Sequence, residues 1–334
     1  MYRPLADDGI LRRIIGAAAA APSIHNTQPW RVKVTSDDVI ELHGDPDRML
    51  WVADPHGRAL HLSCGAALFN ITLAVRMAGS KALIWPLPDP PGEPTLLATV
   101  QLAEGRPASL AEHEMFEAIG LRHTNREPFS ERLVPDSVLI DLEQEAGFEY
   151  AVLRMLSGRD TAAVLEIARA ASQTLAEDFD HQVELGKWLG DRPTDGIPAA
   201  ALGAQPDRSP APVRDLGYAS LTIAHPTASF ERMPQLAVLS TARDEPADWL
   251  RAGQALQRVL LTATRHGVAT SFLYQPMELH DMDGTDSWWP WPEYPQIILR
   301  LGYGPPAVHT PRRPIEEILD RPGTNSATRE PGRT

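Results

Sequence analysis

The sequence is poor in cysteine, in clusters of basic residues and in long apolar runs, and each shortage excludes a class of protein. Its single cysteine, Cys64, cannot form an intrachain disulfide or a multi-cysteine metal site. The net charge of -13 and the lack of basic clusters argue against a general nucleic-acid binder. No segment approaches the roughly 20 consecutive apolar residues of a membrane span. We therefore expect a cytoplasmic protein with no nucleic-acid or membrane partner.

Most of the familiar catalytic signatures are also missing. The 11 histidines form no HExxH pattern, and no GxSxG, GxGxxG or Walker A loop occurs. These gaps disfavour a catalytic metal, a serine hydrolase and the common nucleotide-binding loops. We expect no bound metal, and we interpret Cys64 as a small buried apolar residue.

The sequence does contain an approximate internal repeat. Two long apolar helices are predicted, over Ala59–Gly79 and Trp249–Gly267. They align at one constant offset, which matches Gly65, Leu68 and Gly79 with Gly253, Leu256 and Gly267. Capped helices are predicted to begin at Asp7 or Asp8 and at Asp136, and strands are predicted after each long helix. Both halves thus share the order helix, strand, helix, strand, strand, although chance recurrence of such elements is an alternative.

The two long helices are predicted to pack on each other. A helix that is apolar on nearly every face needs more cover than one small sheet provides. In contrast, the segment Thr174–Met233 has no counterpart in the first half and is rich in proline, glycine, aspartate and alanine. It is predicted to be an irregular excursion of the kind that covers a site. The polar residues 321–334 are predicted to be a disordered tail.

Three short segments carry polar residues with no evident structural role. The first, PSIHNTQPW at Pro22–Trp30, crowds donors and acceptors between two prolines, which suits the edge of a polar heterocycle. The second, LRHTNREPF at Leu121–Phe129, and the third, TPRRP at Thr310–Pro314, supply arginines of the kind that hold phosphate. A helix N-terminus near the second segment would add a favourable dipole. The alternatives are a helix-terminating turn for the first segment and a solvated charged linker for the second.

Together these segments resemble the nitroreductase family of FMN enzymes, and in particular its internally duplicated, single-chain group, often termed Acg-like. PSIHNTQPW is the most specific match, and the order of segments covers the chain to about Leu319. The resemblance implies an α+β, nitroreductase-like fold. Two pseudo-symmetric halves, each a helix-flanked and mostly antiparallel sheet, would be fused as an intramolecular pseudo-dimer. The halves would span residues 1–120 and 121–320, with a lid-like excursion at about 174–233.

The same resemblance implies which residues bind the cofactor. The loop occurs only in the first half and the arginine-rich segments only in the second, so one FMN per monomeric chain is expected. The flavin ring is expected to face Ser23, Asn26 and Gln28. One face of the ring is expected to lie along Pro276, Met277 and Glu278, with the backbone of Glu278 near flavin N5. The phosphate and ribityl group would be held by Arg122, His123, Thr124, Arg126, Arg312 and Arg313.

The resemblance also implies that the flavin performs the chemistry, with no catalytic side chain. Hydride would pass from NADH or NADPH through the flavin to a nitroaromatic, a quinone or another electron-poor acceptor. A different class of function stays open, in which the protein stores or sequesters FMN beneath the excursion with little turnover. An enzyme that modifies the flavin itself or a halogenated substrate is a third alternative.

Overall fold

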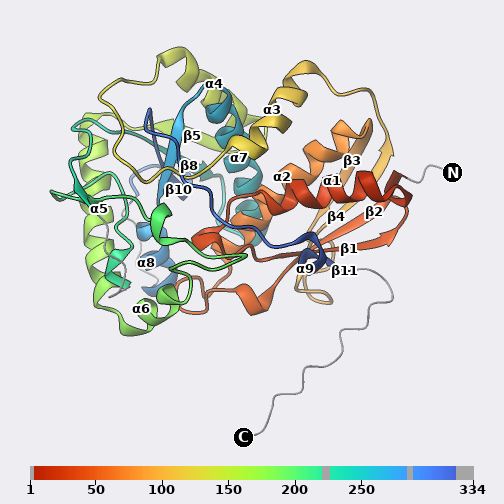
Figure 1. Ribbon diagram of the computed structural model, residues 1–334, viewed down its shortest axis with the longest axis horizontal. Helices are drawn as coiled ribbons and strands as arrows, with labels where there is room; N and C mark the ends of the chain where they lie inside the picture. The colour runs from red at the N-terminus through yellow and green to blue at the C-terminus, as the bar shows by residue number, and fades with distance from the viewer. Residues whose placement is uncertain (1–3, 220–225, 284–288, 321–334) are drawn as a thin grey trace, which may run out of the picture.

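The protein is built from two sheets that lie to either side of a pair of long helices, α2 (Arg58–Met77) and α7 (Pro246–Arg265) (Figure 1). The computed structural model describes residues 4–219, 226–283 and 289–320. The predicted disordered tail, 321–334, lies outside the described residues. Helices and strands are both abundant and the sheets are mostly antiparallel, so the α+β class is confirmed.

The first half begins with a helix that starts where the sequence predicts. The Asp7 side chain caps α1 by accepting hydrogen bonds from the backbone N–H groups of Gly9 and Ile10. The elements of this half are α1 (Asp8–Ala19), β1 (Trp30–Ser36), β2 (Val39–Gly44), α2, β3 (Ser80–Pro86), β4 (Leu96–Glu104) and α3 (Leu110–Leu121).

The second half repeats the order helix, strand, strand, helix, strand, strand, with the excursion inserted after its first strand and α8 inserted between its last two main strands. Each half thus has two strands before its long helix, where the sequence analysis predicted one. Its helices are α4 (Asp136–Gly147), α5 (Gly158–Glu177), α6 (Phe179–Gly186), α7 and α8 (Gln275–Asp283). Its main strands are β5 (Val152–Met155), β8 (Gln235–Thr241), β9 (Ala269–Leu273) and β10 (Tyr294–Gly302). In both halves a glycine with positive φ, Gly79 or Gly267, follows the long helix by two residues and allows the chain to turn.

The two sheets have the same topology. Strands follow the order β1-β2-β4-β3 in the first sheet and β5-β8-β10-β9 in the second, and all of these neighbours are antiparallel. Matching strand order in two halves of one chain is strong support for internal duplication, because chance recurrence of helices would not reproduce it.

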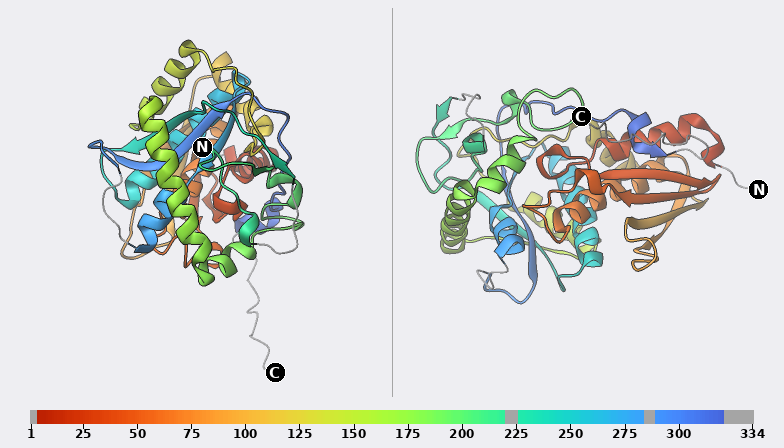
Figure 2. Two further views of the ribbon diagram at one scale, coloured as in Figure 1. Left: turned by 90° about the vertical axis from the view of Figure 1, so that its left-hand side faces the viewer. Right: turned by 90° about the horizontal axis from the view of Figure 1, so that it is seen from below.

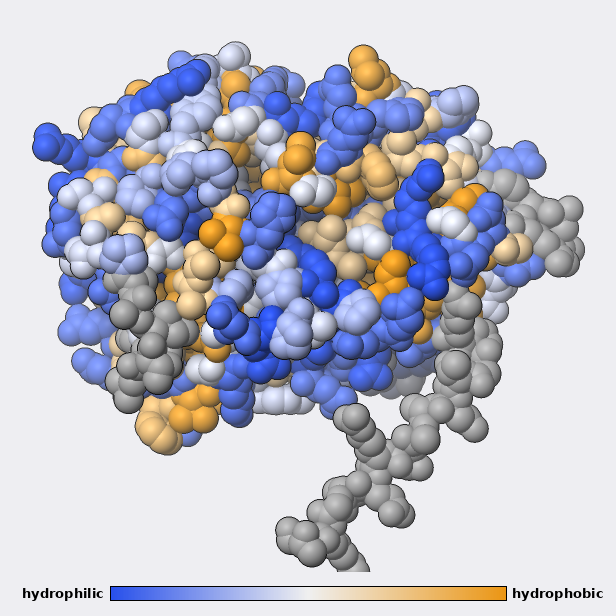
Figure 3. All heavy atoms as spheres, in the orientation of Figure 1, coloured by the Kyte–Doolittle hydropathy of each residue, from blue (hydrophilic) through white to orange (hydrophobic). Residues whose placement is uncertain are grey.

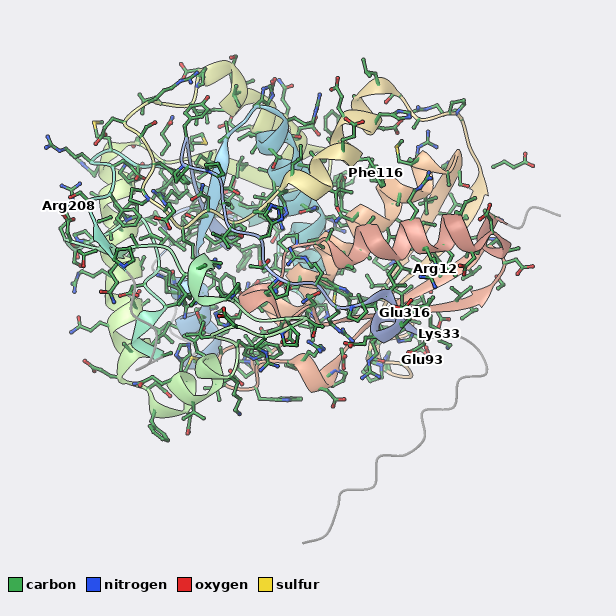
Figure 4. The ribbon with its side chains drawn as sticks, in the orientation of Figure 1. Arg12, Lys33, Glu93, Phe116, Arg208 and Glu316 are labelled. Atoms are coloured by element: carbon green, nitrogen blue, oxygen red, sulfur yellow. The ribbon has the colours of Figure 1, made fainter. Side chains whose placement is uncertain are left out.

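The end of the chain returns to the first sheet. After β10 the chain forms α9 (Ile315–Ile318) and β11 (Leu319–Asp320), and β11 pairs with β1 in parallel. Arg12 of α1 and Glu316 of α9 form an ion pair at 3.2 Å, and both labels lie beside α1 in Figure 4. Because both side chains are well exposed, the pair adds little stability. The return of the chain, however, places Thr310–Pro314 beside the loop that follows α1.

The two long helices cross with almost no space between their backbones. A Cβ atom added at Gly65 would lie 2.1 Å from the carbonyl oxygen of Leu250, and one added at Gly253 would lie 2.1 Å from that of Leu62. The two contacts are related by the same offset as the sequence repeat, so the crossing is pseudo-symmetric. Only glycine fits at these two positions, because any side chain would strike backbone.

Each half completes its core with side chains from the long helix of the other half. Leu250 and Leu261 of α7 belong to the core of the first half, and Ala59 and Leu62 of α2 belong to the core of the second. This exchange confirms that the long helices pack on each other. As predicted, Cys64 on α2 is fully buried.

Helix α2 is the element that comes nearest to a membrane span, although the sequence analysis expected none. Its length and apolar composition suffice to cross a bilayer, yet 78% of its most apolar stretch is buried inside the protein. A core helix satisfies the same criteria. On the face shown in Figure 3, polar residues predominate and apolar residues lie in scattered groups.

The excursion is more ordered than its composition predicts. It includes the end of α5, all of α6 and the short parallel strands β6 (Gln205–Pro206) and β7 (Thr227–Ala228). A small apolar cluster holds it together: Leu185, Ile197, Ala201, Leu202 and Leu216. Figure 2 shows these green segments along one side of the second half, reaching toward the first. A local core therefore gives a proline-rich segment a defined shape.

Gly65→Ala is expected to destabilise the protein by about 1–3 kcal/mol, because the added methyl group meets the Leu250 carbonyl and forces the helices apart. Urea unfolding followed by circular dichroism measures the change. Gly120→Ala is the control, since its Cβ atom meets nothing within 4 Å and alanine favours the helix. Equal stability of the two variants would show that the crossing is not the tight constraint described above.

Candidate functional site

A cavity opens between the two halves. The cavity proper is narrow, with a volume of about 90 Å³, and it opens into a mouth that is continuous with solvent. Its polar lining comes from the loop after α1, from α2, from the chain after α3, from the excursion and from the end of β9: Ser23, His25, Ser63, Thr124, Arg126, Arg214 and Tyr274. Its apolar lining includes Leu62, Leu216, Leu256, Phe272 and Ile297. Both halves and the excursion thus contribute to one site.

The loop Pro22–Trp30 has a strained backbone. His25, Asn26 and Gln28 all adopt positive φ angles, of 46°, 57° and 51°. Such angles are unfavourable for residues other than glycine, and they persist only where surrounding contacts enforce them. Here the Ser23 hydroxyl accepts a hydrogen bond from the Gln28 backbone at 2.9 Å, and the Ser63 hydroxyl accepts one from Ile24 at 3.2 Å. The loop is therefore held in shape against a local cost.

The side chains of Asn26 and Gln28 are engaged by protein rather than directed into the cavity. The Asn26 amide donates to the carbonyls of Gly196 and Pro311, at 2.9 and 3.0 Å. The Gln28 amide donates to the carbonyls of Thr194, at 2.9 Å, and of Asn26, at 3.4 Å. These bonds use all four amide hydrogens. Of the predicted ring-facing residues in this loop, only Ser23 lines the cavity.

Arg313 serves as an internal brace. Its backbone N–H donates to the Gln28 side chain at 2.8 Å, and its guanidinium donates to the carbonyls of Gln28, Trp30 and Glu317. The side chain is buried, and all of these partners belong to the loop, to β1 and to α9. Arg313 thus braces the loop, whereas the charge of its neighbour Arg312 acts on Arg122.

Arg122 and Arg312 form a cationic cluster with two histidines, in which Arg122 is buried, Arg312 and His123 are partly buried and His309 is exposed. The Nε and Nη1 atoms of Arg122 have no hydrogen-bond partner, although the side chain is buried. Arg312 donates to Asn26 Oδ1 at 2.9 Å and to the Thr310 hydroxyl at 2.6 Å. His123 stacks on His309 with ring centroids 3.9 Å apart. In the described part of the chain, no salt bridge joins these groups to a carboxylate.

Burial without a counterion shifts the titration of this cluster. Burial lowers the pKa of Arg122 to about 9, and the neighbouring Arg312 adds to the effect. Burial likewise lowers the pKa of Arg312 to about 10. Burial, His309 and the two arginines lower the pKa of His123 to about 4, so its imidazole is neutral at pH 7. Both arginines remain charged at pH 7, and guanidinium groups with no bound carboxylate have the chemistry to bind an anion such as phosphate.

The segment that carries Arg122 differs from the sequence-based expectation. No helix begins directly after it: Arg122 caps the C-terminal end of α3, and α4 begins only at Asp136. The expected helix dipole is therefore not supplied by this segment, since a helix C-terminus favours cations. Thr124 instead forms a bridge with Thr270, next to β9, and this pairing carries the chain toward the cavity.

Arg126 lies apart from the cluster and lines the cavity. Its Nη1 atom donates to the backbone carbonyl of Ala201 in the excursion at 3.0 Å. Burial and, to a smaller extent, Arg214 of the excursion lower its pKa to about 10. The cavity and the cationic cluster are thus linked by one short stretch of chain, in which Arg122 and His123 face the cluster while Thr124 and Arg126 face the cavity.

The residues Pro276, Met277 and Glu278 form the first turn of α8 and do not line the cavity. The backbone N–H groups of Met277 and Glu278 donate to the Tyr274 carbonyl, at 3.1 and 3.0 Å. The cavity instead meets the preceding residues, Phe272 and Tyr274.

The Glu278 side chain anchors the excursion. Its two carboxylate oxygens lie 2.6 Å from Arg214 Nη1 and 2.8 Å from His181 Nε2, and all three side chains are buried. Burial alone would raise the pKa of Glu278, but Arg214 and the His181 hydrogen bond lower it to about 2. Glu278 is therefore an anion at neutral pH. His181 and Arg214 were not predicted from the sequence, because the excursion has no counterpart in the first half with which to compare it.

Two further buried side chains line the cavity without hydrogen-bond partners. These are His25, through both ring nitrogens, and Tyr274, through its hydroxyl. Native proteins rarely leave such groups unsatisfied, and a ligand is one explanation of an exception. His25 lies inside the PSIHNTQPW segment but was not predicted, because the resemblance assigned only Ser23, Asn26 and Gln28 of this segment to the ring.

These observations fit a planar ligand that carries a phosphate. The unpaired cations at Arg122 and Arg312 match a phosphate group, and the adjoining cavity, with apolar walls and a few polar groups, matches a planar ring. Among the described residues, no three histidine, cysteine or acidic side chains are placed to hold a metal ion.

Two curated proteins of Mycobacterium tuberculosis (strain ATCC 25618 / H37Rv) are similar to this chain over nearly its whole length. One, provisionally named NAD(P)H nitroreductase acg, is 34% identical over 329 residues, which cover 93% of this chain and 95% of that protein. The other, provisionally named NAD(P)H nitroreductase Rv3131, is 31% identical and covers 95% of this chain and 92% of that protein. No family model matches the chain.

Solved nitroreductases align with the chain only at low similarity. FMN-dependent nitroreductase NfnB from Mycobacterium smegmatis, in complex with NADPH, gives a TM-score of 0.36 at 16% identity, over 63% of this chain and 97% of that one. A nitroreductase with bound FMN from Desulfitobacterium hafniense DCB-2 gives 0.39 at 15% identity, over 61% and 95%. The curated relatives, and not these alignments, carry the family assignment.

Arg122→Ala is expected to weaken FMN binding about tenfold to a hundredfold, because it removes a charge-assisted phosphate contact worth roughly 1.5–3 kcal/mol. The ligand-free variant should be no less stable than the wild type, since the removed charge is buried without a counterion. Fluorescence titration with FMN and thermal unfolding measure the two effects. Arg169→Ala, on the exposed face of α5, is the control. A ligand-free Arg122→Ala protein that unfolds would show that this arginine is structural instead.

Proposed function

This chain belongs to the nitroreductase family, in its acg-like group, and from that premise we propose that it binds one FMN and passes hydride from NADH or NADPH to an electron-poor acceptor. A nitroaromatic or a quinone is the proposed class of acceptor. The sequence similarity to two proteins named as NAD(P)H nitroreductases over more than nine-tenths of the chain supports this reading. A cytoplasmic location stays a prediction from composition.

The observation that carries the proposal is the cationic cluster beside the cavity, whose buried member is Arg122. Arg122, His123 and Arg312 would hold the FMN phosphate, and His309 joins them. We favour FMN over FAD because such a cluster suits a terminal phosphate and leaves no evident path for an adenylate. Thr124 would lie at the ribityl group, on the way from the cluster to the cavity.

The chain's own residues would prepare the cavity for the ring. When bound, FMN supplies the two-electron redox chemistry. The apolar side chains of Leu62, Leu256 and Ile297 exclude water from the cavity walls. Arg126 has a backbone carbonyl as its described partner, so its charge is available to stabilise negative charge that develops on the ring.

Asn26, Gln28 and Arg313 would act by positioning the loop. Their hydrogen bonds tie Pro22–Trp30 to the excursion and to the segment after β10. This network would hold Ser23 toward the ring. Pro276, Met277 and Glu278 would support the ring through Tyr274, which precedes them, and the approach of the Glu278 backbone to flavin N5 stays a prediction.

A storage or sequestering role is the second candidate, and the docked excursion favours it. The excursion touches the first half through Arg48 and Asp195, which form an ion pair at 2.9 Å, and through Glu184, which accepts from the backbone of Val52 and Ala53. It also bonds the loop and Arg126 as described above. Many contacts of this kind would slow the exchange of FMN and the arrival of a second substrate.

Mixing the FMN-loaded protein with excess NADH or NADPH in a stopped-flow instrument is expected to bleach the flavin absorbance on a timescale of seconds or faster, with recovery on adding 1,4-benzoquinone. This outcome follows if the excursion opens on the microsecond-to-millisecond timescale of lids. Free FMN mixed with the same donors is the control for non-enzymatic reduction. Bleaching no faster than this control would favour the storage role.

The chain is proposed to be a monomer that contains its own pseudo-dimer interface. The crossing of α2 and α7 buries within one chain the surfaces that two subunits would otherwise share. Light scattering combined with flavin quantitation is expected to give a single-chain mass and one FMN per chain. Two FMN per chain, or an obligate dimer, would refute this arrangement.

A further inference from the structure

We propose that His25 recognises the electron acceptor, by donating a hydrogen bond from its neutral imidazole to an oxygen atom of the ligand that enters the cavity. This inference rests on the proposed function, because it names a ligand of the same cavity. It assigns to His25 the recognition of a carbonyl or nitro oxygen, a role that the resemblance to the family did not give to this residue.

The first support is the unsatisfied state of the His25 ring. The residue is 6% exposed, and neither Nδ1 nor Nε2 has a hydrogen-bond partner. Burial has removed water from both nitrogens, and nothing in the described structure replaces it. Since the ring lines the cavity, a ligand there is the partner that restores these bonds.

The second support is the charge state that the surroundings impose. The charged and titratable groups around His25 come from three elements: Arg126 from the chain after α3, Arg214 and His181 from the excursion, and Glu278 from α8. Burial lowers the pKa of His25 to about 3, and Arg214 contributes more than Glu278 opposes. The imidazole is therefore neutral across the physiological range, with one N–H donor and one acceptor nitrogen.

The chemistry of this end of the cavity selects an oxygen as the partner. Arg126 and Arg214 are donors, and Glu278, the one described carboxylate that acts on His25, already binds both Arg214 and His181. A ligand atom placed among these donors must accept hydrogen bonds. The apolar side chains of Leu216, Phe272 and Ile297 elsewhere in the lining suit a flat hydrocarbon body. A planar aromatic ketone, quinone or nitro compound combines both properties.

The third support is the backbone, which fixes the ring in place. His25 has φ 46° and ψ 21°, in the left-handed region, and the Ser63 hydroxyl holds the preceding residue. Gln28 of the same loop also has a positive φ, of 51°, so glutamine is a side chain that this loop already carries on such a backbone. His25→Gln is therefore a variant that retains a donor and an acceptor, and His25→Phe is one that retains only the ring.

The test is a binding cycle on the FMN-loaded protein with two ligands that resemble each other in shape. Acetophenone carries one carbonyl oxygen, and ethylbenzene lacks it. Each is titrated against the wild type, His25→Phe and His25→Gln, and the shift of the visible flavin spectrum gives the Kd. The wild type is expected to prefer acetophenone by roughly fivefold to tenfold, the value of one neutral hydrogen bond. His25→Phe should lose this preference, and His25→Gln should keep part of it.

A kinetic arm separates recognition from electron transfer. Enzyme reduced with dithionite is mixed with 1,4-benzoquinone or with ferricyanide, a one-electron acceptor that needs no hydrogen bond in the cavity. In His25→Phe, reoxidation by benzoquinone should slow about fivefold or more, while reoxidation by ferricyanide changes less than twofold. His113→Phe, on the exposed face of α3, should match the wild type in both assays.

The outcomes distinguish this proposal from the proposed function. An unchanged preference for acetophenone in His25→Phe overturns the role of His25. A tenfold loss of FMN affinity in His25→Phe also overturns it, because it would show that the imidazole holds the cofactor. If the wild type fails to bind FMN or to be reduced by NAD(P)H, the proposed function fails instead. Thermal unfolding of both variants confirms that each compared protein is folded.

Discussion

The close approach of α2 and α7 at Gly65 and Gly253 is the constraint on which the rest of the structure depends. Because no side chain separates the helices there, each helix reaches into the core of the other half and supplies Ala59, Leu62, Leu250 or Leu261 to it. Neither sheet has a complete core alone. The crossing also shapes the wall of the cavity, since α2 provides Leu62 and Ser63 to that wall and α7 provides Leu256.

The site stores unfavourable electrostatics that a ligand can relieve. Arg122 is buried and Arg312 partly buried, with no carboxylate bonded to either in the described structure, and the lowered pKa values express that cost. The left-handed residues of the Pro22–Trp30 loop add conformational strain. An anionic ligand therefore stabilises such an apoprotein more than it would stabilise one whose charges are already paired. Arg313 differs from these two arginines, because carboxylates of Asp45 and Glu317 lie 3.9 and 3.7 Å from its guanidinium.

The excursion is what distinguishes this site from an open cleft. Glu278 holds it through Arg214 and His181, and the carbonyls of Thr194, Gly196 and Ala201 accept from residues of the site. The groups that shape the cavity therefore also fasten its cover. This coupling is consistent with either gated turnover or prolonged retention of a cofactor, because both depend on how often these bonds open together.

The sequence by itself determined the duplicated order of elements, the burial of the long helices and the segments that carry chemistry. Apolar periodicity marks each long helix within a short stretch of sequence, and the constant offset from Gly65 to Gly253 aligns the two copies. Both signals can be read without the tertiary structure, because helix geometry determines which residues share a face. Tertiary structure alone decided which residues of those segments face the cavity. Asn26, Gln28 and Arg313 turn to protein while His25 turns inward, since a strained loop and the returning chain after β10 fix their directions. It also decided the roles of His181 and Arg214, which lie far from the motifs in sequence and meet the site only through packing, and it placed His309, which directly precedes Thr310–Pro314, against His123.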